Sequence, residues 1–392
     1  MLTPLREATR ARCGGKAATL SGLLREGLPV PDGFVVTFDE LASREASAHP
    51  ELPDELSDAV ARELERMGDP VVAVRSSAAN EDTEDASAAG QYESILGVRG
   101  AADVGEAIIA CRASARSSRV TEYWSRTSGD TSESTPEMAV LVQRLIAAEV
   151  SGVMFTPAQE GGSTRIEASW GLGLTVVGGR VTPDSYEVVP DGTVQLTIGR
   201  KETRIDLNQE AAGLSNSPVD EQMRTARALS DGDVTSLAEL GSQIAALLGG
   251  PQDVEWAIAD GETWILQARP ITASLPHPSY SEPIVRGGML TGASASHGVV
   301  TARARIVRGL SDFCQVRPGE ILVCPYTDPA WTPLFRIAAG IIAETGGTLS
   351  HAAIVAREYG IPAVLGVAGA LQRIHDGDRI TLDGTEGTIT PS

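Results

Sequence analysis

The chain has 392 residues, 42% of them hydrophobic, and carries a formal net charge of -20. Its length suits two or three domains with full cores, and its negative charge argues against a protein that binds nucleic acid through a basic face. No apolar run approaches the roughly 18 residues that a membrane span needs, and the start lacks the long apolar stretch of a signal peptide. We therefore expect a cytoplasmic protein with no nucleic-acid or membrane partner.

Lysine and cysteine are used sparingly. Among 32 basic residues the only lysines are Lys16 and Lys201, and a lysine that persists in such a composition is a candidate for presenting a compact ammonium group to a phosphate. The 4 cysteines are scattered without a CxxC pair, which argues against a structural zinc site or a disulfide framework.

The first predicted helix follows a glycine turn, Gly14-Gly15-Lys16, and leads to a strand that begins near Gly33. Glycines before a lysine at a helix start can cradle a phosphate. The three letters GGK are nevertheless far weaker than a full phosphate-loop motif, and on their own they favour a structural turn.

Two arginine-bearing elements come next. An apolar strand ends on Arg75, and small residues follow it, with Gly90 and Ser94 towards their end. Such a loop lets backbone N–H groups and hydroxyls approach a phosphate closely, although a surface strand that ends in an arginine is an equally good interpretation of the spacing. A helix around 110–124 then carries Arg119 on a basic stripe, for which a solvated face is the simpler explanation.

The middle of the chain predicts two strands joined by a bend over residues 140–156, with Gln143 before the bend and Glu149 after it. Residues 201–233 are polar and predict an exposed insertion or lid. A helix over 234–248 follows.

A hairpin is predicted after this helix, because Asp260-Gly261 between two apolar runs is the strongest short hairpin signal. In this hairpin Glu255 and Gln267 face each other, two oxygen ligands suited to holding Mg²⁺ against a triphosphate. Charged hairpin residues are more often simply exposed, so the spacing alone leaves both interpretations open.

The last part of the chain is organised around His351. A buried strand, a two-glycine turn with Thr and Ser, a helix that opens at His351 and a second strand after Gly-Ile-Pro follow one another. A histidine at a helix N-terminus faces unpaired backbone N–H groups, so an anion bonded to its ring is stabilised there. For a lone histidine, capping of the helix is the simpler interpretation.

The run GGTLSHAAIVAR, which contains His351, resembles the signature of the phosphoenolpyruvate-utilising, phosphohistidine-carrying domain. Pyruvate phosphate dikinase, phosphoenolpyruvate synthase, rifampin phosphotransferase and the first enzyme of the sugar phosphotransferase system share this domain. The resemblance implies that the histidine accepts a phosphoryl group and passes it on. It also implies supporting roles for the residues of the phosphohistidine loop, namely Gly346, Gly347, Thr348 and Ser350.

The part of the chain before the linker resembles the nucleotide-binding domain of the same dikinases, through GGK, VRSSA…ED…AGQ and D-x-E-W…LQ-x-RP. This resemblance implies ATP and Mg²⁺ as ligands. The implied metal ligands are Glu255 and Gln267. The implied nucleotide contacts are Lys16, Arg75, Gly90, Ser94, Arg119, Gln143, Glu149 and Arg269.

The implied fold is α/β (α+β), with a two-part ATP-grasp domain over 1–272 and a small swivelling β/β/α phosphohistidine domain over 289–392. The subdomains are expected at about 1–136 and 137–272, and the Pro- and Ser-rich stretch 273–288 reads as a linker.

Two positions depart from the family. Leu174 replaces the last residue of the usual GLGE, which puts an acid-base or ribose role at that loop in doubt, and His297 replaces the proline of S-P-G.

By resemblance, the β-phosphoryl group of ATP moves to His351 with release of AMP and phosphate, and then to an acceptor. Neither the large barrel of the dikinases nor the antibiotic-binding domain of rifampin phosphotransferase is recognised in this sequence. Three functions stay open. The chain is an enzyme that phosphorylates a small-molecule acceptor such as a metabolite or antibiotic hydroxyl, a split phosphoenolpyruvate synthase-like subunit that acts on pyruvate with a separate acceptor chain, or a phosphocarrier that acts on a protein partner.

Overall fold

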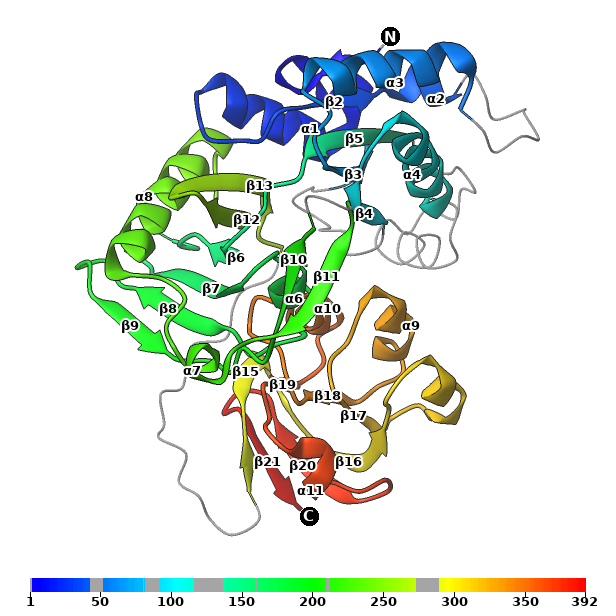
Figure 1. The fold of residues 1–392 in the computed structure, drawn as a ribbon. Helices are drawn as coiled ribbons and strands as arrows, with labels where there is room; N and C mark the ends of the chain where they lie inside the picture. Colours follow the sequence, from blue (N-terminus) through cyan, green and yellow to red (C-terminus); the bar gives the residue numbers. More distant parts are fainter. Residues whose placement is uncertain are drawn as a thin grey trace.

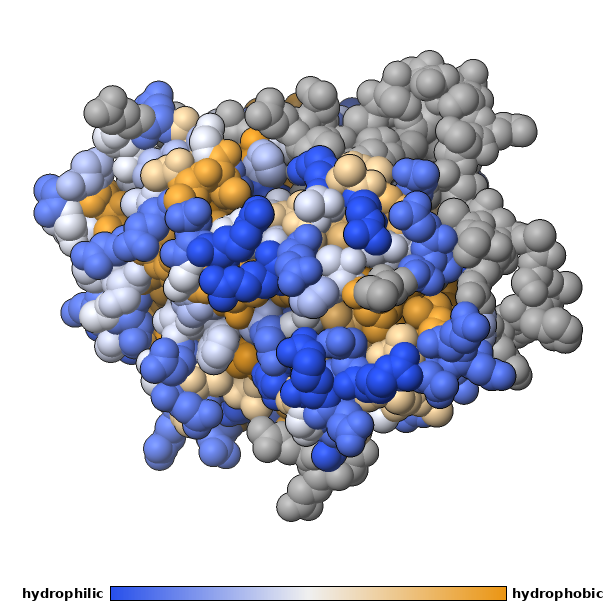
Figure 2. Space-filling view, turned by 90° about the horizontal axis from the view of Figure 1, so that it is seen from above, coloured by the Kyte–Doolittle hydropathy of each residue, from blue (hydrophilic) through white to orange (hydrophobic). Residues whose placement is uncertain are grey.

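The computed structural model describes most of the chain, namely residues 2–42, 52–79, 81, 92–115, 137–159, 161–208, 212–272 and 289–392. Helices and strands are mixed, and the strands form sheets of five, six and eight strands and one two-stranded ribbon, so the protein is α/β (Figure 1). Among the helices of these ranges, none has the length and apolar character to cross a membrane. Hydrophilic side chains cover much of the face seen in Figure 2.

The N-terminal sheet has the strand order β1-β2-β5-β3-β4. Its strands are β1 (Thr3–Pro4), β2 (Gly33–Val36), β5 (Met138–Arg144), β3 (Val72–Ala78) and β4 (Ser94–Val98). Side chains alternate between its two faces: Phe34 and Val36 pack with helices α3 (Asp54–Arg66) and α4 (Ala101–Ser114), whereas Val35 packs on the side of helix α1 (Arg10–Arg25). The short helices of this part are η1 (Leu5–Glu7) and α2 (Phe38–Ala42).

Helix α1 contains the predicted glycine turn. Gly14 interrupts the helix with φ 79° and ψ 178°. A Cβ at this position would lie 2.1 Å from the carbonyl oxygen of Ser77, so only glycine allows α1 and β3 to approach this closely. The turn places Lys16 at the start of the regular helix, beside the end of β3.

The central sheet is antiparallel and has the order β13-β12-β6-β7-β8-β9. Its strands are β13 (Glu262–Pro270), β12 (Gln252–Ala259), β6 (Val150–Phe155), β7 (Thr164–Trp170), β8 (Asp184–Val188) and β9 (Val194–Thr197). Helix α8 (Asp231–Leu248) packs on one face, and α6 (Leu174–Val177) follows β7. The hairpin prediction is confirmed, because Asp260 and Gly261 both have positive φ and the register pairs Glu255 with Gln267.

The passage from the first sheet to the second falls at residues 145–149. The subdomain division that the sequence predicts at about residues 136–137 stays a prediction. In the structure β5, which follows that position, pairs with both β2 and β3 of the N-terminal sheet. The predicted bend between two strands is confirmed, and it joins β5 of one sheet to β6 of the other. Figure 1 shows the two sheets meeting there.

The segment predicted as an exposed insertion forms the ribbon β10 (Thr203–Leu207) and β11 (Leu214–Pro218), followed by α7 (Glu221–Arg224). The ribbon reaches from the central sheet to the N-terminal sheet (Figure 1). At its turn, a Cβ on Gly97 of β4 would lie 2.9 Å from the Cα of Gly213. The segment is therefore a bridge between the two sheets, and its first residue, Lys201, is buried.

Lys201 forms a fully buried ion pair with Asp184 of β8. The same carboxylate also accepts hydrogen bonds from the backbone N–H groups of Gly199 at 2.8 Å and Ala228 at 2.7 Å. The presence of Lys201, one of the two lysines, is thus explained by a structural ion pair that lies outside the cavity of the candidate site.

We expect Lys201→Met to lower the free energy of unfolding by about 3–5 kcal/mol, because it leaves the Asp184 carboxylate buried without its cation. Urea unfolding followed by circular dichroism measures the change, and Arg200→Met, at an exposed neighbouring position, is the control. Equal stability of the two variants would contradict the structural role of the pair.

The C-terminal sheet has eight strands in the order β14-β21-β20-β16-β17-β18-β19-β15. They are β14 (Leu290–Thr291), β21 (Thr388–Pro391), β20 (Arg379–Asp383), β16 (Val299–Ile306), β17 (Ile321–Cys324), β18 (Gly340–Ala343), β19 (Ala363–Leu365) and β15 (Ala293–Ser296). Its helices are η2 (Leu310–Gln315), η3 (Pro329–Trp331), α9 (Thr332–Phe335), α10 (His351–Tyr359) and α11 (Ala370–Arg373). The predicted succession of strand, glycine turn, helix and strand around His351 is confirmed as β18, α10 and β19.

Candidate functional site

A cavity of about 370 Å³ lies where the three large sheets meet. Residues from the N-terminal sheet, the central sheet and the C-terminal part all line it. Of the residues singled out from the sequence, it brings together Lys16, Arg75, Ser94, Gln143, Glu255, Gln267, Arg269 and His351.

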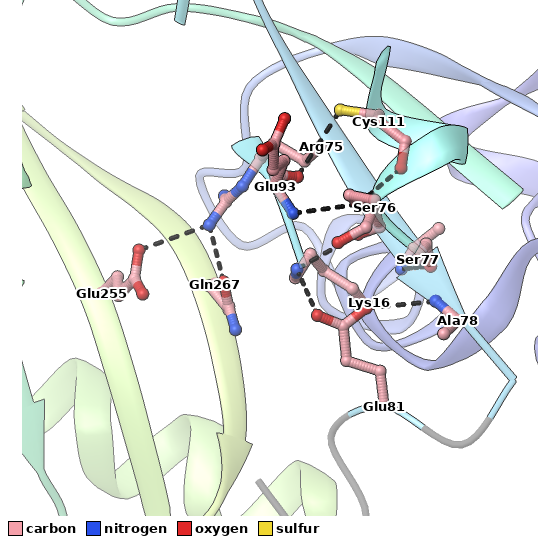
Figure 3. Close-up of polar contacts among 12 residues, drawn as sticks. Lys16, Arg75, Ser76, Ser77, Ala78, Glu81, Glu93, Cys111, Glu255 and Gln267 are labelled. Carbon is pink, nitrogen blue, oxygen red and sulfur yellow. Dashed lines mark hydrogen bonds and ion pairs between the residues drawn. The ribbon is translucent and has the colours of Figure 1, made fainter. Parts of the chain in front are cut away.

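Lys16 lines the cavity and is buried, and Figure 3 shows it beside Glu81 and Ser76. Its Nζ donates to Glu81 Oε1 at 2.8 Å and to the carbonyl oxygen of Ser76 at 3.1 Å. The other oxygen of Glu81 accepts from the backbone N–H of Ala78 at 3.1 Å. Lysine ammonium and glutamate carboxylate therefore neutralise each other in a site that is closed to solvent.

Arg75 reaches from β3 to the hairpin of β12 and β13 (Figure 3). Its guanidinium group donates to Gln267 Oε1 at 2.6 Å and to the carbonyl oxygen of Leu266 at 2.8 Å, and it lies 3.4 Å from Glu255 Oε2. The Glu255 and Gln267 oxygens thus converge on one positive charge. This arrangement suits a cation site, and the pairing of the two strands holds both side chains in place.

Arg269 forms a third ion pair inside the cavity, with Asp253 at 2.8 Å. Both side chains are buried. Burial raises the pKa of Asp253, and the attraction of Arg269 opposes this rise. Of the cationic nucleotide contacts that the sequence predicts, the three that the structure describes, Lys16, Arg75 and Arg269, are therefore each held by a carboxylate. An entering polyphosphate would replace these carboxylates with its own negative oxygens.

The predicted Mg²⁺ site can be tested against the side chains that surround it. In the part of the chain that the structure describes, no group of three or more His, Cys, Asp or Glu side chains could hold a metal ion. Glu255 and Gln267 supply two oxygen ligands, and Mg²⁺ typically takes its other ligands from phosphates and water. The donor set fits Mg²⁺ that arrives with a nucleotide and does not fit a permanently bound structural metal.

The two predicted nucleotide contacts near the bend, Gln143 and Glu149, lie differently. Gln143 lines the cavity and donates from Nε2 to the carbonyl oxygen of Pro31 at 3.1 Å. Glu149 does not line it, because its Oε1 accepts from the backbone N–H of Asp260 at the turn of the hairpin, 3.1 Å away. The structure therefore places Glu149 outside the group in which the sequence analysis includes it. Leu174, the departure from GLGE, presents an apolar side chain to the cavity.

His351 is the first residue of α10, after the N-cap residue Ser350, and only 4% of its surface is exposed. It lines the cavity together with Leu349 and Ile354. The free N–H groups of a helix start favour a negative charge at this place. The other loop residues do not line the cavity. They are Gly346, Gly347, Thr348 and Ser350.

Two predicted contacts, Gly90 and Arg119, lie outside the described residues, so their assignments remain predictions. The sequence analysis also misses four charged residues that the structure places at the site or beside it. They are Glu81, Asp253, Glu167 and Arg357. Glu81, Asp253 and Arg357 lie within the quoted motifs, and this is the signal that could have found them, whereas nothing in the sequence marks Glu167.

The arrangement defines an α/β protein in which a histidine-bearing C-terminal part closes a cation-lined cavity of the N-terminal part. Residues 42–280 match the family model described as pyruvate phosphate dikinase, AMP/ATP-binding domain, and residues 316–387 match the PEP-utilising enzyme, mobile domain. The chain therefore belongs to the pyruvate phosphate dikinase family, as its motifs predict.

Curated relatives agree. The chain is 36% identical over 420 aligned positions to a probable phosphoenolpyruvate synthase of Methanothermobacter thermautotrophicus, covering 96% of this chain and 61% of the relative. It is 32% identical over 458 positions to the phosphoenolpyruvate synthase of Aeropyrum pernix, covering 96% and 56%. The chain thus spans about three fifths of the length of these relatives. A D-alanine-D-alanine ligase from Coxiella burnetii is similar at 12% identity over 66% of this chain and 47% of that one, with a TM-score of 0.29, which is too low to inform the fold.

Proposed function

We propose that this protein transfers the β-phosphoryl group of ATP to His351 and releases AMP and inorganic phosphate. The observation that carries the proposal is the shared cavity, which is lined by His351 and by the cationic side chains of Lys16, Arg75 and Arg269. Phosphoryl transfer depends mainly on positioning and on neutralising charge, and a cavity that joins a nucleophile to three cations supplies both.

In the proposed reaction a nitrogen of the neutral imidazole of His351 attacks the β-phosphorus. The bond from this phosphorus to the oxygen shared with the α-phosphorus breaks, and AMP leaves. One water molecule then cleaves the β–γ bond and releases inorganic phosphate. Histidine, ATP and water are thereby converted to phosphohistidine, AMP and phosphate.

Each cation has a role in this scheme. Lys16, Arg75 and Arg269 bind the phosphates in place of Glu81, Glu255 and Asp253, which hold them in the structure described above. Once Arg75 has moved to a phosphate, the side-chain oxygens of Glu255 and Gln267 that it contacts can hold Mg²⁺. The metal, when bound, neutralises part of the triphosphate charge.

The phosphohistidine then delivers its group to an acceptor, for which we propose a small molecule. The names of the relatives as phosphoenolpyruvate synthases favour pyruvate over a metabolite or antibiotic hydroxyl. A separate acceptor subunit and a protein partner are the two alternatives. They differ in where the label goes when a second protein is added, because an acceptor subunit passes it to pyruvate and a protein partner keeps it.

The test uses purified protein with Mg²⁺ and ATP labelled separately at the β and γ positions, without acceptor. We expect β label to remain on the protein while AMP and phosphate appear. Retention of γ label with ADP as the product would contradict the proposal and indicate an ordinary kinase-like relay. Pyruvate is then added to the labelled protein, and loss of label to phosphoenolpyruvate supports pyruvate as acceptor, whereas loss only after a second protein is added supports an acceptor subunit.

A further inference from the structure

We propose that Glu167 is a positioning residue that clasps the phosphohistidine loop and holds His351 in the cavity. Glu167 lies on β7 of the central sheet, whereas the loop precedes α10 in the C-terminal part. This inference rests on the proposed function for its kinetic consequence, but not for the contact itself.

The contact is a set of hydrogen bonds to one carboxylate. Oε1 of Glu167 accepts from the backbone N–H of Thr348 at 2.6 Å and from its Oγ1 at 2.9 Å. Oε2 accepts from the backbone N–H of Leu349 at 3.2 Å. These two N–H groups belong to the residues just before Ser350, the N-cap of α10. The carboxylate therefore binds the backbone directly before the helix that begins with His351.

The loop is built to admit this carboxylate. A Cβ at Gly347 would lie 2.2 Å from Glu167 Oε2, so only a glycine allows the carboxylate to come this close to the backbone. The preceding glycine, Gly346, has φ 103° and donates its N–H to the carbonyl oxygen of Val181 at 3.0 Å. The two glycines of the motif therefore have a docking role in addition to shaping the turn.

Thr348 is held from both sides. Its N–H and hydroxyl bind Glu167, and its carbonyl oxygen accepts from Arg357 Nη1 at 2.8 Å. Arg357 also donates to the carbonyl oxygen of Ala295 at 2.9 Å, which ties this side to the C-terminal sheet. The peptide before the N-cap of α10 is thus fixed between a carboxylate of one part of the protein and a guanidinium of the other.

Other contacts also join the two parts. Thr345 Oγ1 donates to the carbonyl oxygen of Gly179 at 2.6 Å, and Thr272 Oγ1 donates to Glu358 Oε1 of α10 at 3.1 Å. An apolar cluster includes Phe155, Leu349 and Ile354, but apolar packing gives adhesion and little orientation. Glu167 differs from these contacts because its one carboxylate accepts three hydrogen bonds from the two residues just before the N-cap of α10, and hydrogen bonds to a charged acceptor are short and directional. It therefore contributes most directly to where the loop sits on the central sheet.

The carboxylate is buried, with 2% of its surface exposed. Burial raises the pKa of Glu167, and its bonds to Thr348 and Leu349 and the charge of Arg357 oppose this rise. A buried charge is costly unless it is hydrogen-bonded, so Glu167 stabilises the docked loop and is itself satisfied only while the loop is docked. The clasp is nevertheless reversible, because water can replace the backbone donors when the His351 part moves away to an acceptor.

The test compares Glu167→Gln with Glu187→Gln as a control. Glu187 lies on β8, the strand next to β7, and pairs with Arg165, so it is on the same face of the central sheet as Glu167. The amide of glutamine is neutral and places a donor against the N–H groups of the loop. We expect hydrogen exchange at the Thr348 and Leu349 amides to become at least about tenfold faster in Glu167→Gln, without nucleotide present. Exchange in β18 and exchange in Glu187→Gln should stay as in the unmodified protein.

The second readout is single-turnover labelling of the protein by ATP carrying β label. A misplaced nucleophile lowers the rate of the chemical step, so we expect labelling by Glu167→Gln to be about 10- to 100-fold slower, with the half-saturating ATP concentration unchanged within about twofold. Glu167→Asp, which keeps the charge, should recover part of the rate. A variant that loses ATP affinity and rate together has a merely structural defect and would contradict the positioning role.

Thr348→Val provides a second route if Glu167→Gln folds poorly, since it removes only the hydroxyl donor. It should slow labelling less than Glu167→Gln, and the double variant should be no slower than Glu167→Gln alone. If the rates of amide hydrogen exchange at Thr348 and Leu349 in Glu167→Gln are unchanged, the proposal that Glu167 holds the loop is wrong. If the unmodified protein is not labelled at all, the proposed function fails, and the exchange data still decide whether Glu167 holds the loop.

Discussion

Replacing His351 with alanine is expected to abolish acid-labile labelling of the protein by ATP while leaving its affinity for ATP within about twofold of the original. The reason is that different residues of the cavity are proposed to bind ATP and to attack it. Lys16 lies on helix α1, Arg75 on β3 and Arg269 on β13, so the groups proposed to bind ATP stay when the imidazole is removed. Alanine offers no nucleophile for the β-phosphorus.

Titration calorimetry with ATP and Mg²⁺ measures the binding, and β label that survives base but not acid measures the phosphohistidine. His375→Ala is the control, because His375 is exposed and lies outside the cavity. It should be labelled like the unmodified protein. Normal labelling of His351→Ala would remove the central claim, and loss of ATP binding in that variant would show that the imidazole belongs to the nucleotide site instead.

The parts of this site that could be predicted from the sequence are those set by local chemistry. The Asp260-Gly261 turn fixes the register that pairs Glu255 with Gln267, and Ser350 and His351 begin a helix after two glycines. Each of these depends on residues close together in the chain. For this reason motif and structure agree on them.

The parts that the sequence analysis missed depend on distant contacts. Glu167 and Thr348 are 181 positions apart, and neither the strand pattern around Glu167 nor its charge indicates a partner. Glu149 lies near the bend, but its carboxylate accepts a hydrogen bond from the N–H of Asp260, so its predicted nucleotide contact stays a prediction. Side-chain direction follows from tertiary packing, which a linear pattern does not contain.

The passage between the two sheets also depends on distant contacts. Which strands belong to a sheet is set by how they pair, and β5 completes the N-terminal sheet by inserting between β2 and β3. The passage at 145–149 then lies directly at the cavity, through Leu145, Ile146 and Ala148.

Replacing Lys16 with methionine is expected to slow labelling of His351 by about 10²- to 10³-fold, the cost of removing one preorganised charge from a phosphoryl-transfer site. It should also lower the free energy of unfolding by about 3–5 kcal/mol, because Glu81 is then left as a buried carboxylate without its cation. The two effects have different causes, and a second substitution separates them.

The double variant Lys16→Met with Glu81→Gln removes the buried charge that the single variant leaves behind. It should recover most of the lost unfolding free energy, measured in urea, but none of the labelling rate. The stability control is Lys201→Met, whose ion pair with Asp184 lies outside the cavity. This variant should be destabilised to a similar extent and still be labelled at the normal rate while it remains folded. If the double variant regains its labelling rate, Lys16 serves only to neutralise Glu81, and the phosphates must be bound by Arg75 and Arg269 without it.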